Sequence, residues 1–154
     1  MDDQSLIFGF FNEIGIVSQL SSAYLNRHLP DGVYSSHFSV LNHLCRLGDG
    51  RTPMQIASAM QVTKATMTHT LAVLEARGFV ETRSNPADGR SKTVYLTASG
   101  RTFREKAIES LVTGFSAVAP KINLDHLRTA LPILQELRKL LDEERATRPG
   151  PASD

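Results

Sequence analysis

Large apolar residues near the N-terminus recur every three or four positions, which is the spacing of one face of an amphipathic helix. This stretch runs from Leu6 to Leu25 and is followed by the turn-forming sequence Pro30-Asp31-Gly32. A second helical pattern can be capped by Ser35 or Ser36 and stops at Gly48-Asp49-Gly50. The chain is therefore expected to begin with two helices.

The next part of the pattern predicts two short helices joined by a tight turn. Thr52-Pro53-Met54-Gln55 has the form of a capping box, with proline at the first helical position. A few residues later, Thr63 can cap another helix, which runs to Arg77 and is closed by Gly78. Two helices in this arrangement are typical of a helix-turn-helix.

The periodicity then changes from helical to strand-like. Residues 79–83 and 93–97 are rich in β-branched and aromatic side chains. The polar segment 84–92 between them contains Asn-Pro and Asp-Gly, two turn signals. A hairpin with a long, partly basic tip is therefore expected.

Helical spacing returns after the hairpin. One helix carries apolar residues from Phe103 to Phe115, and the last one starts near Asn123 and carries leucines up to Leu141. Pro132 is expected to kink that last helix. The terminal segment 147–154 is expected to be disordered.

The apolar stripes of the first and last helices are larger than one small core can cover. They can pack on one another within the chain, or they can join two chains in a symmetric dimer. We favour the dimer, because such stripes would be strongly exposed in a monomer.

Composition narrows the class of protein. The 154 residues, 41% of them apolar and 21% charged, fit one globular domain. No uninterrupted apolar run approaches the roughly 20 residues of a membrane helix, and the first residues lack the basic start of a secretory signal. The single cysteine, Cys45, excludes an intramolecular disulfide and a cysteine-only metal site. These features predict a cytoplasmic protein without a membrane partner.

The charge is unevenly distributed, although the chain as a whole carries only +1. Residues 51–106 hold nine basic and four acidic side chains, a net charge of +5, which leaves −4 for the rest. A basic middle between acidic ends favours a polyanion such as DNA as partner. Scattered, solvated cations are the alternative.

On the predicted helix from Thr63 to Arg77, residues Met67, Leu71 and Leu74 share one face and are expected in the core. The opposite face carries small and hydroxyl side chains, which would let the helix enter the major groove of DNA. The alternative is an ordinary solvent-exposed helix. The candidate DNA contacts, with phosphates at the helix start and base edges further along, are Thr63, Lys64, Ala65, Thr66, Thr68 and His69.

The hairpin tip supplies a second set of candidates, Arg90, Ser91 and Lys92. The planar arginine suits the narrow minor groove, and the lysine attracts phosphate. Asp88 would repel phosphate, so with Gly89 it is expected to shape the turn by accepting hydrogen bonds from Arg90 or from the turn backbone. A solvated turn with an incidental ion pair is the alternative.

These residues carry a family resemblance. The run Leu74-Glu75-Ala76-Arg77-Gly78-Phe79-Val80-Glu81, then Asp88-Gly89-Arg90, then Val94-Tyr95-Leu96-Thr97 with Gly100, resembles the MarR (multiple antibiotic resistance regulator) family. Upstream, Ile56-Ala57, Thr66-Met67-Thr68 and Leu71 also fit. The match covers about Ser35 to Gly100, and the chained pattern is far more specific than any one of its parts.

The resemblance implies a fold that is mainly α with a small β-hairpin wing: a winged helix-turn-helix flanked by N- and C-terminal dimerisation helices. Residues 1–154 would form a single MarR-like domain, with the DNA-binding part at 35–98 and the helical dimerisation part at 5–29 and 99–146. The protein would be a homodimeric transcriptional regulator, typically a repressor that binds a pseudo-palindromic operator and is released by a small-molecule inducer. His69 stands where the family often has arginine, so a DNA contact there would be weaker and sensitive to pH.

An apolar pocket for such an inducer could be lined by Phe10, Phe11, Ile14, His37, Phe38 and Leu41, although core packing is the alternative for most of them. A redox- or metal-responsive regulator of the same fold remains open. Cys45 at helical spacing is more typical of a buried small hydrophobe, and the spacing of His37 and His43 does not align them on one helical face. No metal site is therefore expected.

Other classes of protein are less favoured. The chain lacks G-x-S-x-G, H-E-x-x-H, the Walker A loop, G-x-G-x-x-G, C-x-x-C and S-x-x-K, so neither an enzyme nor a cofactor is expected. A non-catalytic protein-interaction module is disfavoured by the basic hairpin tip.

Overall fold

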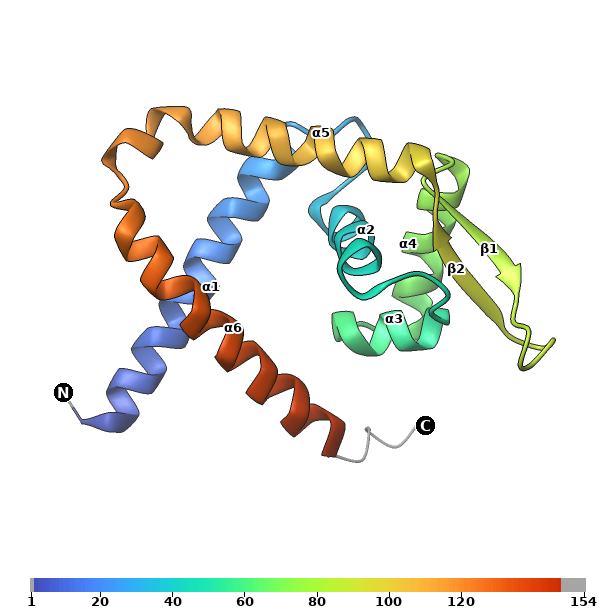
Figure 1. Cartoon of the computed structure of the whole chain (residues 1–154), viewed down its shortest axis with the longest axis horizontal. Helices are drawn as coiled ribbons and strands as arrows, with labels where there is room; N and C mark the ends of the chain where they lie inside the picture. The colour runs from blue at the N-terminus through green and yellow to red at the C-terminus, as the bar shows by residue number, and fades with distance from the viewer. Residues whose placement is uncertain (1, 148–154) are drawn as a thin grey trace. The chain divides into compact units, whose positions relative to one another are not determined.

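The computed structural model describes residues 2–147, which fall into two compact units. The larger unit ends at Gly114 and the smaller begins at Phe115. Both are built mostly of helices, and the larger also holds one antiparallel hairpin (Figure 1). The expected fold class is confirmed.

The first helix, α1 (Asp3–Asn26), begins where Asp2 caps it by accepting the Ser5 N–H at 2.7 Å. Leu25 is its one buried residue within the described chain. The large apolar side chains of α1 that are exposed by 40% or more are Leu6, Ile7, Phe8, Phe10, Phe11, Ile16, Val17 and Leu20.

By length and composition α1 could cross a membrane. The sequence expectation missed this because it considered only apolar runs, whereas α1 is apolar on average although polar residues are interspersed along it. One such helix near the N-terminus is weak support for a membrane span. An exposed apolar helix of this kind fits a protein interface equally well.

Helix α2 (Ser35–Leu47) starts as expected but is not capped by a serine. Its N-cap is Tyr34, whose N–H donates to Nδ1 of His37 at 2.9 Å. His37, the third residue of the helix, thus reaches back to the N-cap backbone N–H, which is the part that Glu or Gln usually plays in a capping box.

Helices α3 (Pro53–Met60) and α4 (Lys64–Ala76) form the expected pair. Gln55 N–H donates to Thr52 Oγ1 at 3.2 Å, and Thr52 N–H donates to Gln55 Oε1 at 2.9 Å, which confirms the capping box. Gln61 takes a left-handed conformation (φ 55°) and turns the chain toward α4. After α4, Gly78 (φ 71°) ends the helix in a conformation that other residues rarely adopt.

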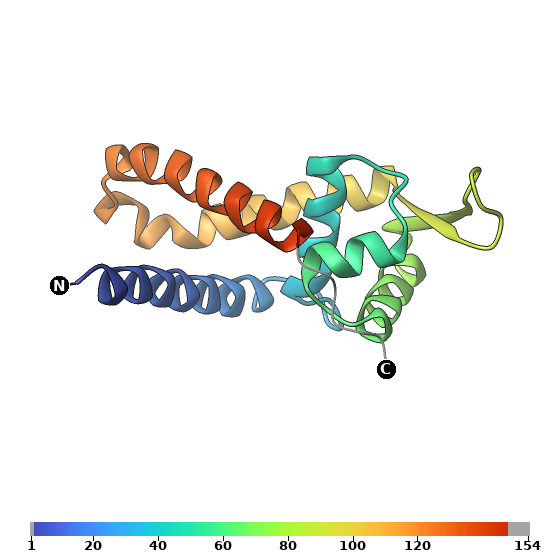
Figure 2. The ribbon, with the colours of Figure 1, turned by 90° about the horizontal axis from the view of Figure 1, so that it is seen from below.

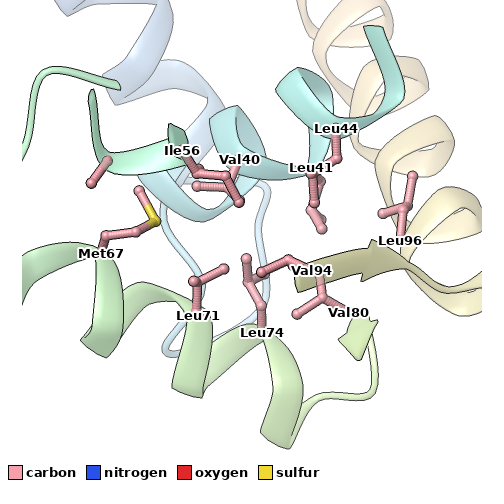
Figure 3. Close-up of a cluster of buried hydrophobic side chains, with 11 residues drawn as sticks. Val40, Leu41, Leu44, Ile56, Met67, Leu71, Leu74, Val80, Val94 and Leu96 are labelled. Carbon is pink, nitrogen blue, oxygen red and sulfur yellow. The ribbon is translucent and has the colours of Figure 1, made fainter. Parts of the chain in front are cut away.

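The core of the larger unit lies where α2, α3, α4 and the hairpin meet (Figure 3). Its members are 9% exposed or less: Val40, Leu41, Leu44, Ile56, Ala57, Met67, Leu71, Leu74, Val80, Val94 and Leu96. Burial of this set holds α4 against the rest of the unit and leaves its other face to solvent.

The hairpin pairs β1 (Val80–Ser84) with β2 (Lys92–Leu96) in antiparallel register. Each strand is displaced by one residue from the sequence expectation. Phe79 is not in β1, since its N–H donates to Leu74 O at the end of α4. Thr97 is not in β2, since its Oγ1 accepts the Gly100 N–H at 3.0 Å at the start of the next helix. Arg51 forms a bridge with Val94 and so extends the hairpin.

Helix α5 (Ala98–Gly114) completes the larger unit and is tied to α2 by Arg104, whose guanidinium donates twice to Asn42 Oδ1 at 3.0 and 2.8 Å. In the smaller unit, 3₁₀ turns η1 (Phe115–Ala117) and η2 (Ala119–Lys121) precede α6 (Leu124–Thr147). Phe115 was expected at the end of a helix but lies in the first of these turns, since α5 stops at Gly114.

Helix α6 contains Pro132 and has no buried residue. Its exposed large apolar side chains are Leu124, Leu127, Leu131, Ile133, Leu134, Leu140 and Leu141. Thr147, expected to begin a disordered tail, is the last residue of α6, where its hydroxyl donates to Glu144 O at 2.8 Å. The rest of the expected tail, 148–154, lies outside the described residues.

Candidate nucleic-acid interface

The outer face of α4 is the first part of the candidate interface. Met67, Leu71 and Leu74 point into the core, as their spacing predicted (Figure 3). The opposite face is exposed and presents small or hydroxyl-bearing side chains, which gives the helix backbone a close approach to a partner surface. The exposed residues are Thr63, Lys64, Ala65, Thr66, Thr68, His69, Ala72 and Ala76.

The hydroxyl groups of α4 are not equivalent. Thr63 Oγ1 accepts the Thr66 N–H at 3.1 Å and donates its own proton to Thr66 Oγ1 at 2.9 Å, so Thr66 keeps a free hydroxyl proton. Thr68 Oγ1 donates to Lys64 O at 2.9 Å, so its hydroxyl has lone pairs to offer but no free proton. This face therefore presents one hydroxyl donor at Thr66 and one hydroxyl acceptor at Thr68.

The beginning of α4 is suited to anions. Lys64 and Ala65 lie in the first turn, where main-chain N–H groups have no partner within the helix. The positive end of the helix dipole and the exposed Lys64 ammonium add to the same effect. A phosphate is the anion that such a site most often receives.

The hairpin is the second part of the interface, and its tip projects beyond α2, α3 and α4 (Figures 1 and 2). Residues 86–90 are exposed. In residues 2–147, Lys64, Arg90 and Lys92 make no ion pair, whereas Arg83 is paired with Glu81 and its guanidinium lies 4.2 Å from the centre of the Tyr95 ring. Cations outside any described ion pair thus stand both at the hairpin tip and at the start of α4.

Asp88 shapes the tip through the backbone. Its Oδ1 accepts the Arg90 N–H at 3.0 Å, which was one of the two roles expected for this carboxylate. Ser91, a candidate DNA contact, is engaged within the loop: its Oγ donates to Asp88 O at 3.2 Å and accepts from Asn85 Nδ2 at 2.8 Å. The role of Asn85 was not apparent from the sequence, where Asn-Pro indicated only a turn.

His37 is the third residue of α2 and is 5% exposed. Burial, the largest cause, lowers the pKa of its imidazole below the ordinary 6.5, and the nearby charges of His69 and Arg77 act in the same direction. Arg77 also donates to the carbonyl of Asp31, which links the end of α4 to the segment between α1 and α2. The imidazole of His37 therefore stays neutral to a lower pH than an ordinary histidine does, because its pKa is lowered.

The residues considered for an inducer pocket are not gathered in one place in this chain. Leu41 is fully buried in the core, and His37 is buried beside it on α2. Phe10 and Phe11 pack edge to face, with ring centres 5.9 Å apart, and are about 40% exposed near the N-terminal end of α1. Because that half of α1 extends away from α2 (Figure 1), a pocket that includes both groups needs further surface from elsewhere.

Cys45 is half-buried against the core, and Arg101 Nη1 donates to its Sγ at 3.4 Å. His28 stacks on Tyr24, with ring centres 4.4 Å apart. Across residues 2–147, no three side chains of His, Cys, Asp or Glu are grouped so as to hold a metal ion.

The known proteins that this chain resembles are MarR itself or other transcriptional regulators. The MarR family model matches residues 31–91. The transcriptional regulator HosA of Escherichia coli O111:H- is 31% identical over 98 residues, which cover 64% of this chain and 71% of HosA. A mutant MarR from E. coli complexed with operator DNA has a TM-score of 0.65 at 24% identity, covering 89% of this chain and 99% of that one. The regulator BldR from Sulfolobus solfataricus has a TM-score of 0.72 at 23% identity, covering 93% and 99%.

Proposed function

Because this chain belongs to the MarR family of winged helix-turn-helix transcriptional regulators, we propose that it is a cytoplasmic repressor that binds a pseudo-palindromic operator as a homodimer. The family consists of DNA-binding transcription factors rather than enzymes. The observation that carries the proposal is that one compact unit presents both an exposed, small-residue face of α4 and unpaired cations at the hairpin tip. The operator complex of the similar E. coli MarR supports DNA as the partner.

In this proposal α4 lies in the major groove. The backbone at Thr63 and Ala65 approaches the phosphates, and Lys64 neutralises one of them. Thr66 donates to a guanine or thymine oxygen, while Thr68 accepts from an adenine or cytosine amino group. His69, exposed one position further along, adds a further contact.

The hairpin acts as the wing. Arg90 enters the minor groove, where a narrow, electronegative channel favours a guanidinium, and Lys92 lies beside the backbone. Asp88, Gly89 and Ser91 set the shape of the loop rather than contacting DNA, since the side chains of Asp88 and Ser91 are already engaged within it.

The dimer is proposed to form through α1 and α6. Both helices expose rows of large apolar side chains, and burying one such side chain contributes about 1.5–3 kcal/mol. A small-molecule inducer is proposed to bind between Phe10, Phe11 and Ile14 of α1 and the separate pair His37 and Phe38 of α2, with surface from the second protomer joining the two groups into one pocket. Leu41 belongs to the core and is left out of this pocket.

The test begins with a duplex that the protein itself selects from a random-sequence pool, and with a scrambled duplex of the same length. Arg90→Ala should weaken binding to the selected duplex by roughly 1–3 kcal/mol in fluorescence anisotropy. Lys92→Ala should weaken binding to both duplexes alike and reduce the salt dependence by about one unit. Asp88→Ala should also weaken binding, although removal of a negative charge would strengthen it on Coulomb grounds alone.

Arg128→Ala is the matched control. It removes the same side chain and charge from α6, where Asp125 already pairs with it at 2.7 Å, and it should bind both duplexes like the parent. If Arg90→Ala also binds like the parent at every salt concentration, the wing does not contact DNA. A gain of affinity in Asp88→Ala would show that this carboxylate only repels phosphate.

A further inference from the structure

The loop 85–91 at the hairpin tip is closed by two half-buried residues, Asn85 and Ser91, while residues 86–90 between them are exposed. Asn85 N–H donates to the Ser91 carbonyl at 3.0 Å. Asn85 Nδ2 donates to Ser91 Oγ at 2.8 Å. One backbone bond and one side-chain bond thus join the two ends of the loop just beyond the last pair of the strands, Ser84 and Lys92.

The same two residues also bond to the loop backbone at Ala87 and Asp88, which precede Arg90. Asn85 Oδ1 accepts the Ala87 N–H at 3.0 Å, which fixes the first half of the loop. Ser91 N–H and Ser91 Oγ both donate to the Asp88 carbonyl, at 3.0 and 3.2 Å. A continuous chain of hydrogen bonds therefore runs from Asn85 Nδ2 through Ser91 Oγ to the accepting Asp88 O, and Arg90 lies between Asp88 and Ser91 in the sequence.

The guanidinium of Arg90 has no hydrogen-bond or ion-pair partner in the described part of the chain, so only the backbone determines where it is presented. A loop that is ordered before binding loses less conformational entropy when its arginine enters a groove. We propose that Asn85 is a positioning residue for DNA binding, which acts through Ser91 and Asp88 to present Arg90. This inference rests on the proposed function of the wing.

A direct contact between Asn85 and DNA fits the geometry less well. The amide oxygen is engaged with Ala87, one amide proton is engaged with Ser91, and the side chain is half-buried beneath the exposed loop. A role in overall stability is also a poor fit, because neither Asn85 nor Ser91 belongs to the core. Loss of the amide should loosen the tip and leave the rest of the molecule intact.

The experiment is a double-mutant cycle of Asn85→Ala and Arg90→Ala, measured on the selected duplex by anisotropy. Asn85→Ala alone should weaken binding about 3–10-fold, the range expected for losing one or two hydrogen bonds that order the loop. In the Arg90→Ala background the same change should alter binding by less than about twofold, because the group that it positions is gone. Ser91→Ala should reproduce the effect of Asn85→Ala and add little to it.

Two further measurements separate positioning from a general loss of structure. Ser84→Ala changes a residue of the stem for which no side-chain hydrogen bond is found in residues 2–147, and it should bind DNA like the parent. Amide exchange at Ala87 and Ser91 should become faster in Asn85→Ala, while the thermal midpoint stays within about 2 °C of the parent.

The possible failures can be told apart. If Arg90→Ala binds like the parent, the proposed function of the wing fails, and the role of Asn85 fails with it. If Arg90→Ala binds weakly but Asn85→Ala binds like the parent, only the role of Asn85 is overturned. Equal losses from Asn85→Ala in both backgrounds would show that Asn85 acts independently of Arg90.

Discussion

Gly100→Ala should destabilise the larger unit strongly, although alanine is the better helix former. Gly100 is the third residue of α5 and is buried. A Cβ added there would lie 2.0 Å from the carbonyl oxygen of Phe79 and 2.9 Å from Leu96 Cδ1, whereas ordinary contacts are 3.4–4 Å. The closest obstacle is backbone, so either α5 or the turn after α4 must move by more than 1 Å.

The cost can be built from the bonds that such a movement disrupts. Thr97 N–H donates to Phe79 O at 3.1 Å, and Gly100 N–H donates to Thr97 Oγ1 at 3.0 Å. Each contributes about 1 kcal/mol net, and overpacking adds about 1–3 kcal/mol. The gain in helix propensity offsets at most about 1 kcal/mol. The free energy of unfolding should therefore fall by about 2–4 kcal/mol, a large part of the roughly 5–15 kcal/mol typical of a native protein.

Urea unfolding followed by far-UV circular dichroism measures this change, at one fixed protein concentration because a dimer unfolds in a concentration-dependent way. Gly15→Ala is the matched control: the same substitution inside α1, where, among residues 2–147, nothing beyond the neighbouring residues and the backbone of the helix itself lies within 4 Å of the added Cβ. It should leave stability unchanged or raise it by up to about 1 kcal/mol. A Gly100→Ala protein that unfolds within 1 kcal/mol of the parent would refute the packing described here for α5.

Three other changes test separate parts of the molecule. Thr63→Ala removes the acceptor of the Thr66 N–H and should cost about 0.5–2 kcal/mol of stability in the same urea assay, with weaker DNA binding. Burial lowers the pKa of His37 in the folded protein, so as the pH falls below 6.5 the unfolded chain takes up a proton on this imidazole before the folded chain does. The contribution of His37 to the free energy of unfolding should therefore be full above pH 6.5 and decrease below it. The decrease should be smaller in His37→Gln. Replacing the exposed Leu127 and Leu131 of α6 by Asp should give monomers in sedimentation velocity, and a stable dimer in that variant would exclude α6 from the interface.

The elements that could be predicted from the sequence are those set by local chemistry. The capping box at Thr52 and the cap at Thr63 need only neighbouring residues, and the helical spacing of Met67, Leu71 and Leu74 defines the core face of α4 without further information. The chained motif ending at Gly100 indicated the family, which the comparisons confirm.

Features that depend on unusual or distant partners could not be predicted. Thr70 is buried in α4, and its hydroxyl is satisfied there because it donates to Thr66 O at 3.0 Å. A prediction that assigns only apolar residues to the core does not find such a position. Asp49 Oδ1 accepts the Leu96 N–H at 2.8 Å across 47 positions of sequence. Asn85 and Ser91 are both common turn residues, and in the sequence they look like any solvated turn residue. Only the structure shows that their side chains are hydrogen-bonded to each other.

Hydroxyl-radical footprinting of the parent protein on its selected duplex tests the central claim most directly. A two-fold dimer with one α4 in the major groove of each half-site predicts two equivalent protected regions about one helical turn, 10–10.5 bp, apart. The Arg90→Ala variant should lose the protection of the flanking minor groove and keep that of the half-sites. Protection of a single half-site at saturating protein, or a footprint unchanged by Arg90→Ala, would contradict the account.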